Sequence, residues 1–113
     1  MPPKTELVTF AIKPGKEARA EEWMRMLVER RDECIATLAR EQMHYESIFR
    51  LWRDGRLYLT WFSVQGEAGE RVEGSPFEVD RLHMAFWREC IDDEVPPTAH
   101  EHVVRFVPGP MGS

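Results

Sequence analysis

Strand-like and helix-like patterns alternate along this chain in an order that only a few small folds share. Alternating apolar and β-branched residues predict strands, whereas apolar residues that recur every three to four positions predict helices. This β-α-β-β-α-β order is the split βαβ, or ferredoxin-like, arrangement, an α+β fold with a four-stranded antiparallel sheet and two helices on one face. The predicted elements cover residues 5–12, 16–42, 44–53, 56–65, 75–91 and 100–107.

Short turn and cap signals mark the boundaries of these segments. Asp54-Gly55 lies between two strand patterns and predicts a two-residue β-hairpin. Ser75, Pro76 and Glu78 supply a capping hydroxyl, a first-turn proline and a third-position acid, which together predict a helix start. Residues 66–74 contain three glycines and no periodicity, so we expect a mobile surface loop, either a lid over a pocket or a plain connector.

One polar side chain stands at the centre of each predicted apolar helix face. Residues 16–42 lack proline and glycine and keep helical periodicity, so they predict one long helix with Arg31 in the middle of its apolar face. His83 has the corresponding place in the helix predicted over 75–91. A charge that faces a core needs a partner or a route to water. The apolar residues around Arg31 are Ala20, Trp23, Met24, Leu27, Val28, Cys34, Ile35 and Leu38.

Length, charge and cysteine content limit the class of protein. The 113 residues, 42% hydrophobic and 31% charged, suffice for one domain over 1–107, and we expect a disordered tail at 108–113. A net charge of -5 and a pI near 5.4 argue against nucleic acid or an anionic membrane as partner. The chain has neither a signal-peptide pattern nor a long apolar run, so we expect a cytoplasmic protein. Cys34 and Cys90 lack metal-ligand spacing and are predicted to be buried free thiols.

The strands predicted over 44–53 and 56–65 have apolar or aromatic residues on both faces. A sheet with one face in water alternates more cleanly between apolar and polar residues. We therefore expect a second subunit on the open face, which gives a homodimer. The two sets are Tyr45, Phe49 and Leu51 against Ile48 and Trp52, then Leu57, Leu59 and Trp61 against Tyr58, Phe62 and Val64.

Arg31, Glu46 and His83 are the main candidates for chemistry. Glu46 shares its strand parity with Ile48, so its carboxylate is predicted to point toward the helices and meet Arg31. In this interpretation His83 transfers protons, Glu46 orients it, and Arg31 binds a substrate carboxylate, enolate or phenolate. The structural alternative is that Arg31 extends to the surface, Glu46 crosses the dimer interface and His83 is a satisfied core residue.

Aromatic residues near this set predict the walls of an apolar pocket. Trp61, Trp87 and Tyr45 are expected to contact the substrate, with plain core packing as the alternative. We expect no metal site, because the remaining histidines converge only if their strand ends adjoin. These histidines are His44, His100 and His102.

Several stretches resemble the dimeric α+β barrel superfamily, in which two ferredoxin-like subunits pack their sheets face to face. The resemblance covers residues 6–107. It rests on Leu7-Val8-Thr9-Phe10-Ala11-Ile12, Lys13-Pro14-Gly15-Lys16-Glu17, the long helix, and Leu59-Thr60-Trp61-Phe62-Ser63. A small bacterial family of unknown function in that superfamily is similar in Trp23-Met24-Arg25, Tyr45-Glu46-Ser47-Ile48-Phe49 and His83-Met84-Ala85-Phe86-Trp87-Arg88-Glu89-Cys90-Ile91-Asp92.

The resemblance implies a dimer but no single reaction. Superfamily members include cofactor-free oxygenases, polyketide cyclases, haem-degrading oxygenases and isomerases. Haem-degrading members are similar in having a strand tryptophan and a second-helix histidine where Trp61 and His83 stand, but one axial candidate is weak evidence and we expect no cofactor. We expect a dimer that binds a small apolar or aromatic molecule, with oxygenase, cyclase or isomerase chemistry. The alternative is a non-catalytic dimer that binds a metabolite or a protein.

Overall fold

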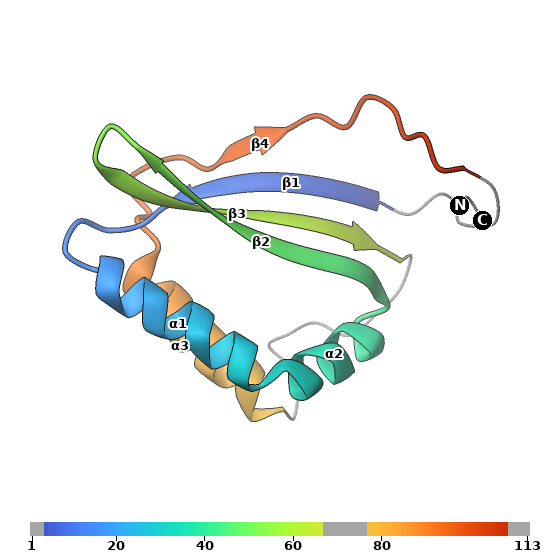
Figure 1. The fold of residues 1–113 in the computed structure, drawn as a ribbon, viewed down its shortest axis with the longest axis horizontal. Helices are drawn as coiled ribbons and strands as arrows, with labels where there is room; N and C mark the ends of the chain where they lie inside the picture. Colours follow the sequence, from blue (N-terminus) through green and yellow to red (C-terminus); the bar gives the residue numbers. More distant parts are fainter. Residues whose placement is uncertain (1–3, 67–76, 109–113) are drawn as a thin grey trace.

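A four-stranded antiparallel sheet forms one layer of the molecule, and the helices pack against one of its faces (Figure 1). The structure is a computed structural model that describes residues 4–66 and 77–108. The strand order is β2-β3-β1-β4, so the α+β class with a four-stranded antiparallel sheet is confirmed. The elements are β1 (Lys4–Ala11), α1 (Glu17–Glu29), α2 (Arg31–Arg40), β2 (Met43–Arg53), β3 (Arg56–Gln65), α3 (Glu78–Cys90) and β4 (Thr98–His100).

The hairpin between β2 and β3 has the turn that its sequence predicts. Arg53 pairs with Arg56, and the two residues between them have positive φ, 53° at Asp54 and 75° at Gly55. Two consecutive left-handed residues match the right-handed twist of the flanking strands. The turn therefore sets the register of the hairpin.

The prediction of one long helix over residues 16–42 is wrong in one respect, because two helices occupy this segment. Arg30, with φ -104° and ψ 33°, ends α1 and precedes α2. The bend lets the Glu33 carboxylate accept a hydrogen bond from the Val79 backbone N–H at 2.7 Å. Arg30 lies 3.3 Å from Glu33 and 3.6 Å from Glu78. These contacts with α3 give a physical reason for a bend that neither proline nor glycine marks.

The prediction of a strand over residues 100–107 is also wrong for most of that segment. Its observed counterpart, β4, is the three-residue strand Thr98–His100, and residues 101–108 have no strand assignment. β-branched and aromatic side chains favour a strand only where a partner strand and a packing surface exist. Val103 and Phe106 are 87% and 88% exposed, so this segment lacks that packing surface.

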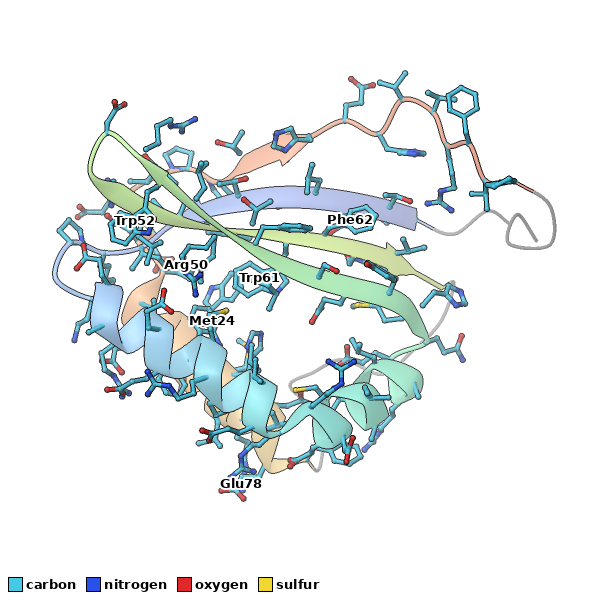
Figure 2. The ribbon with its side chains drawn as sticks, in the orientation of Figure 1. Met24, Arg50, Trp52, Trp61, Phe62 and Glu78 are labelled. Atoms are coloured by element: carbon cyan, nitrogen blue, oxygen red, sulfur yellow. The ribbon has the colours of Figure 1, made fainter. Side chains whose placement is uncertain are left out.

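The helix-side face of the sheet and the apolar faces of α1 and α3 form the core. Ile12, Trp23, Leu57, Leu59 and Cys90 are each at most 1% exposed. Alternation along β3 points Trp61 toward the helices and Phe62 toward the opposite face, as Figure 2 shows. The expected division of β3 into two apolar faces is therefore observed.

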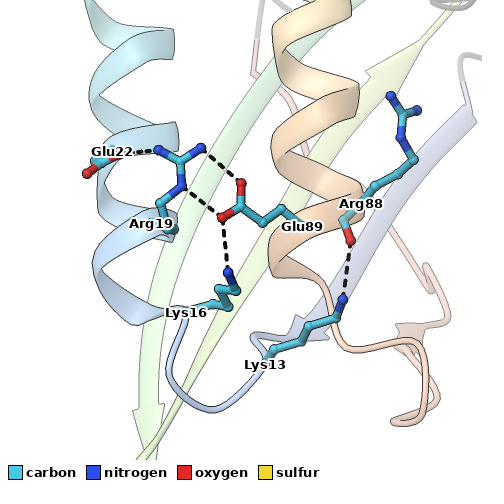
Figure 3. A network of polar contacts seen from close by, with 6 residues as sticks. All are labelled: Lys13, Lys16, Arg19, Glu22, Arg88 and Glu89. Carbon is cyan, nitrogen blue, oxygen red and sulfur yellow. Dashed lines mark hydrogen bonds and ion pairs between the residues drawn. The ribbon is translucent and has the colours of Figure 1, made fainter.

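A surface ion network joins α1 to α3 (Figure 3). The guanidinium of Arg19 donates two hydrogen bonds of 2.9 Å to the Glu89 carboxylate, and Lys16 donates a third at 3.2 Å. The hydrogen bonds from Arg19 and Lys16 lower the pKa of Glu89 to about 2. The bidentate ion pair of Arg19 with Glu89 holds α1 against α3, and these two helices carry Trp23 and His83.

Several expectations fall wholly or partly outside the described residues. The Ser75-Pro76 cap lies there, as do residues 67–74 of the expected loop and residues 109–113 of the expected tail.

Cys34 and Cys90 are free thiols, Cys90 buried and Cys34 half-buried. Within residues 4–66 and 77–108, no helix is long and apolar enough to span a membrane.

Candidate functional site

His83 is held in place by an indole. The Nε1–H of Trp23 donates a hydrogen bond of 3.0 Å to Nδ1 of His83, which joins α1 to α3. The indole nitrogen is a donor only, so Nδ1 must be the acceptor and the proton of a neutral imidazole must lie on Nε2. The contact thus selects one tautomer of His83.

Burial keeps this imidazole uncharged at neutral pH. Loss of hydration lowers the pKa of His83 from 6.5 to about 4. The ring lies 5.4 Å from the Trp23 ring, 6.2 Å from Trp61 and 6.0 Å from Trp87, measured between centroids. An apolar aromatic enclosure disfavours the imidazolium, so His83 offers an Nε2–H donor at pH 7 rather than a positive charge.

His83 lines a cavity of about 290 Å³ between the sheet and the helices, which we call the inner cavity. Trp61 from β3 and Trp87 from α3 line it as well, with their ring centroids 5.1 Å apart. Both tryptophans were predicted to line a pocket, and the structure brings them together with His83. One wall of the inner cavity is therefore aromatic, and one polar donor is set into that wall.

The lining of the inner cavity also includes acidic residues. Glu46 from β2, Asp80 from α3 and the thiol of Cys34 line it. Burial, with a further contribution from the nearby Asp80, raises the pKa of Glu46. Burial likewise raises the pKa of Cys34, and Glu46 and Asp80 add to that shift. Glu46 is an exposed residue of β2 that lines this cavity on the helix side of the sheet, and its carboxyl lies beside Asp80.

Arg31 does not lie in a buried apolar stripe, and that expectation is wrong. It is the first residue of α2, immediately after the bend at Arg30, and it is exposed. Val28 and Ile35, expected on the buried face, are 73% and 53% exposed. The bend turns α2 away from the direction of α1, so the periodicity of one straight helix no longer applies across it. Among the described residues, no ion pair links Arg31 to Glu46.

Tyr45 lies on the wrong face for the predicted pocket. Its ring packs 5.6 Å from the ring of Phe62, and the residue is 53% exposed. Side chains alternate along β2, so Tyr45 and Glu46 point to opposite faces of the sheet. Tyr45 lines neither cavity, and the assignment of a substrate contact to it is corrected.

The sequence-based interpretation missed the residue that orients His83. Glu46 was expected in that role, but the observed partner is Trp23, which had been placed in the apolar stripe of its helix. The available signal was the indole N–H, because a buried tryptophan normally finds an acceptor. Asp80 and Cys34 were also missed as cavity residues, since their approach to Glu46 depends on how α2 and α3 pack.

The remaining histidines lie apart from this site. His44 is in the edge strand β2, whereas His100 in β4 contacts the Leu7 carbonyl at 3.2 Å with its Nδ1. β2 and β4 are the two opposite edges of the sheet, so these strands do not adjoin. Within the described parts of the chain, no group of three or more His, Cys, Asp or Glu residues is placed to hold a metal ion.

Two comparisons with known proteins add to this geometry. Residues 3–108 match the model of a family described as a family of unknown function (DUF6176). A cysteine–tRNA ligase of Cereibacter sphaeroides (strain KD131 / KCTC 12085) is 29% identical over 92 residues, which are 76% of this chain. The chain spans 17% of the length of that curated relative. The similarity is therefore to one segment of the ligase.

Proposed function

We propose that this protein, which belongs to the family of unknown function DUF6176, binds a small apolar ketone or related carbonyl compound in its inner cavity. The observation that carries this proposal is the 3.0 Å hydrogen bond between Trp23 and His83. It leaves the Nε2–H of a neutral imidazole available at a cavity lined by Trp61 and Trp87. Such a donor in an apolar enclosure recognises an uncharged oxygen acceptor.

Glu46 supplies the second group that a proton-transfer reaction needs. Its raised pKa lies closer to neutral pH than that of an ordinary carboxyl, which suits a general base. In the proposed reaction the Glu46 carboxylate removes a proton from the carbon next to the carbonyl, and the electron pair of that C–H bond moves onto the oxygen. The Nε2–H of His83 stabilises the resulting enolate.

For a ketone with a C=C bond at its β,γ position the intermediate is a dienolate, and return of the proton from Glu46 to its γ carbon, with the double bond moving into conjugation, completes an isomerisation. This step is balanced without an oxidant or a second substrate. Of the three reactions expected from the resemblance, isomerisation is therefore the one that needs no group or reactant beyond Glu46 and His83. His83 is a hydrogen-bond donor in this scheme, whereas Glu46 carries the proton.

We further propose that two copies form a ferredoxin-like dimeric α+β barrel through the open faces of their sheets. That face bears exposed apolar and aromatic residues, with Tyr45, Phe49 and Leu51 at 53%, 55% and 40% exposure. The segment after β4 adds Val103 and Phe106, which are almost fully exposed. Exposed apolar surface of this kind favours a protein partner, and a second copy offers the same face.

Hydrogen–deuterium exchange into 2-tetralone tests the proton transfer. This bicyclic ketone has an acidified C–H beside its carbonyl, and exchange in D₂O is followed by NMR. We expect the wild type to accelerate exchange and Glu46→Gln to reduce the accelerated rate by about 100-fold. Glu29→Gln, which changes an exposed carboxylate of α1 outside both cavities, serves as the matched control and should exchange at the wild-type rate.

The same experiment separates the enzyme from its non-catalytic alternative. Cys34 lines the inner cavity, so a bound ketone should slow its alkylation by iodoacetamide. Protection of Cys34 without accelerated exchange would make the protein a binding module and contradict the catalytic proposal. If the ketone neither protects Cys34 nor shows accelerated exchange, both the binding proposal and the catalytic proposal are contradicted.

Sedimentation equilibrium tests the dimer. The wild type is expected at twice the chain mass of 13.3 kDa. Phe49→Asp places a charge on the open face and should give monomers, whereas Ala85→Asp on the exposed side of α3 should leave the dimer intact. A monomeric wild type would refute this part of the proposal.

A further inference from the structure

A second, larger cavity lies next to the inner one. This outer cavity has a volume of about 540 Å³ and is formed by α1, α2, β2 and β3. Its size falls within the range of about 300–1,000 Å³ that is usual for small-molecule sites. Most of its lining is aliphatic or thioether: Met24, Leu27, Val28, Ile35, Leu38, Ile48 and Leu59.

The two cavities differ in charge. Among the described residues, the lining of the inner cavity includes four acidic residues and neither lysine nor arginine. The outer cavity is lined by two arginines, Arg31 and Arg50, and by one acidic residue, Glu46. A carboxylate ligand is therefore disfavoured in the inner cavity and favoured in the outer one.

Only one of the two arginines is available for a ligand. The guanidinium of Arg50 binds both oxygens of Glu21, at 2.6 and 2.7 Å. Arg31 forms no ion pair with any residue of the described ranges 4–66 and 77–108. It is exposed, with exposed Val28 and Ile35 beside it in the lining. A bidentate donor at the edge of an apolar cavity matches the chemistry of an amphipathic acid.

We propose that the outer cavity binds a small amphipathic carboxylate, with its acid group on Arg31 and its apolar chain along Leu27, Ile48 and Leu59. This site lies beyond the ketone site proposed above and takes a different class of ligand. Glu46 and Cys34 line both cavities, so they stand between the two sites. Leu59, which lines the outer cavity, is 1% exposed, so the apolar chain of the ligand lies against the packed core.

Isothermal titration with decanoate, at concentrations below micelle formation, tests the proposal. We expect one decanoate per chain and about tenfold weaker binding to Arg31→Gln, because the variant loses a charge-assisted pair. Arg25→Gln, at an exposed position of α1 outside the outer cavity, is the matched control and should bind as the wild type does. Decanol, which lacks the charge, should bind wild type and Arg31→Gln equally.

A second variant addresses the apolar part of the site. Ile35 is 53% exposed, so Ile35→Glu is expected to fold, and its carboxylate should repel decanoate and abolish binding. Equal affinity of decanoate for the wild type, Arg31→Gln and Ile35→Glu would overturn the proposal, as would binding of several molecules per chain. Exchange of 2-tetralone in Arg31→Gln should stay at the wild-type rate, so failure of this site and failure of the ketone site are distinguishable.

Discussion

The half-buried imidazole of His83 makes the stability of the protein sensitive to mild acid. Its pKa is lowered to about 4 in the folded chain, against 6.5 for an ordinary histidine. The unfolded chain therefore binds more protons between these values, and the folded state loses stability as the pH falls through 6.5 toward 4. Above that window the contribution of His83 is fully present.

The size of this effect follows from the two pKa values. A group that titrates at 6.5 when unfolded and near 4 when folded removes about 2 kcal/mol of stability between about pH 7.5 and about pH 5. His83→Asn has no titrating group, and its amide oxygen can still accept the Trp23 indole hydrogen bond. The pH dependence of this variant should therefore be smaller by about 2 kcal/mol.

Urea unfolding at the two pH values and one protein concentration measures the difference. The free energy of unfolding is obtained for the wild type, His83→Asn and His102→Asn, whose histidine is exposed. His102→Asn should follow the wild type. Identical pH dependence of the wild type and His83→Asn would refute the argument that burial holds His83 neutral.

Three further predictions concern local contacts. Glu33→Ala removes the acceptor of the Val79 N–H, so chemical denaturation should show a loss of about 1 kcal/mol, and an unchanged free energy of unfolding would show that this hydrogen bond does not stabilise the start of α3. Gly55→Ala puts a side chain at φ 75° with no steric contact, so backbone strain should cost about 1 kcal/mol; equal thermal stability would contradict this. Glu46→Gln removes a negative charge near Cys34, lowers its thiol pKa and should speed alkylation near neutral pH; an unchanged alkylation rate would show that Glu46 does not influence the thiol.

Much of the sheet was predictable because its signals are local. The Asp54-Gly55 turn demands two left-handed residues, and the alternating pattern on either side of it sets which residues share a face. These local rules placed Glu46 and Trp61 on the helix side of the sheet. They also place Tyr45 opposite Glu46, so its assignment to the pocket contradicted the parity already in use.

The bend at Arg30 and the short β4 depend on tertiary contacts. No residue in the 16–42 segment forbids a helix, and the bend is associated with the contact of Glu33 with the start of α3. The position of Arg31 follows from that bend. Likewise, Val103 and Phe106 have strand propensity, but their segment pairs with no described strand and its side chains are exposed. Such features require knowledge of how distant elements pack, which periodicity does not contain.

The most direct test of the account is the nitrogen NMR spectrum of the His83 ring at neutral pH, with and without 2-tetralone. The account predicts a neutral ring that has its proton on Nε2, and it predicts that adding the ketone shifts the Nε2–H signal while Nδ1 stays bound to Trp23. A charged ring, a proton on Nδ1, or a spectrum that the ketone leaves unchanged would contradict the central claim.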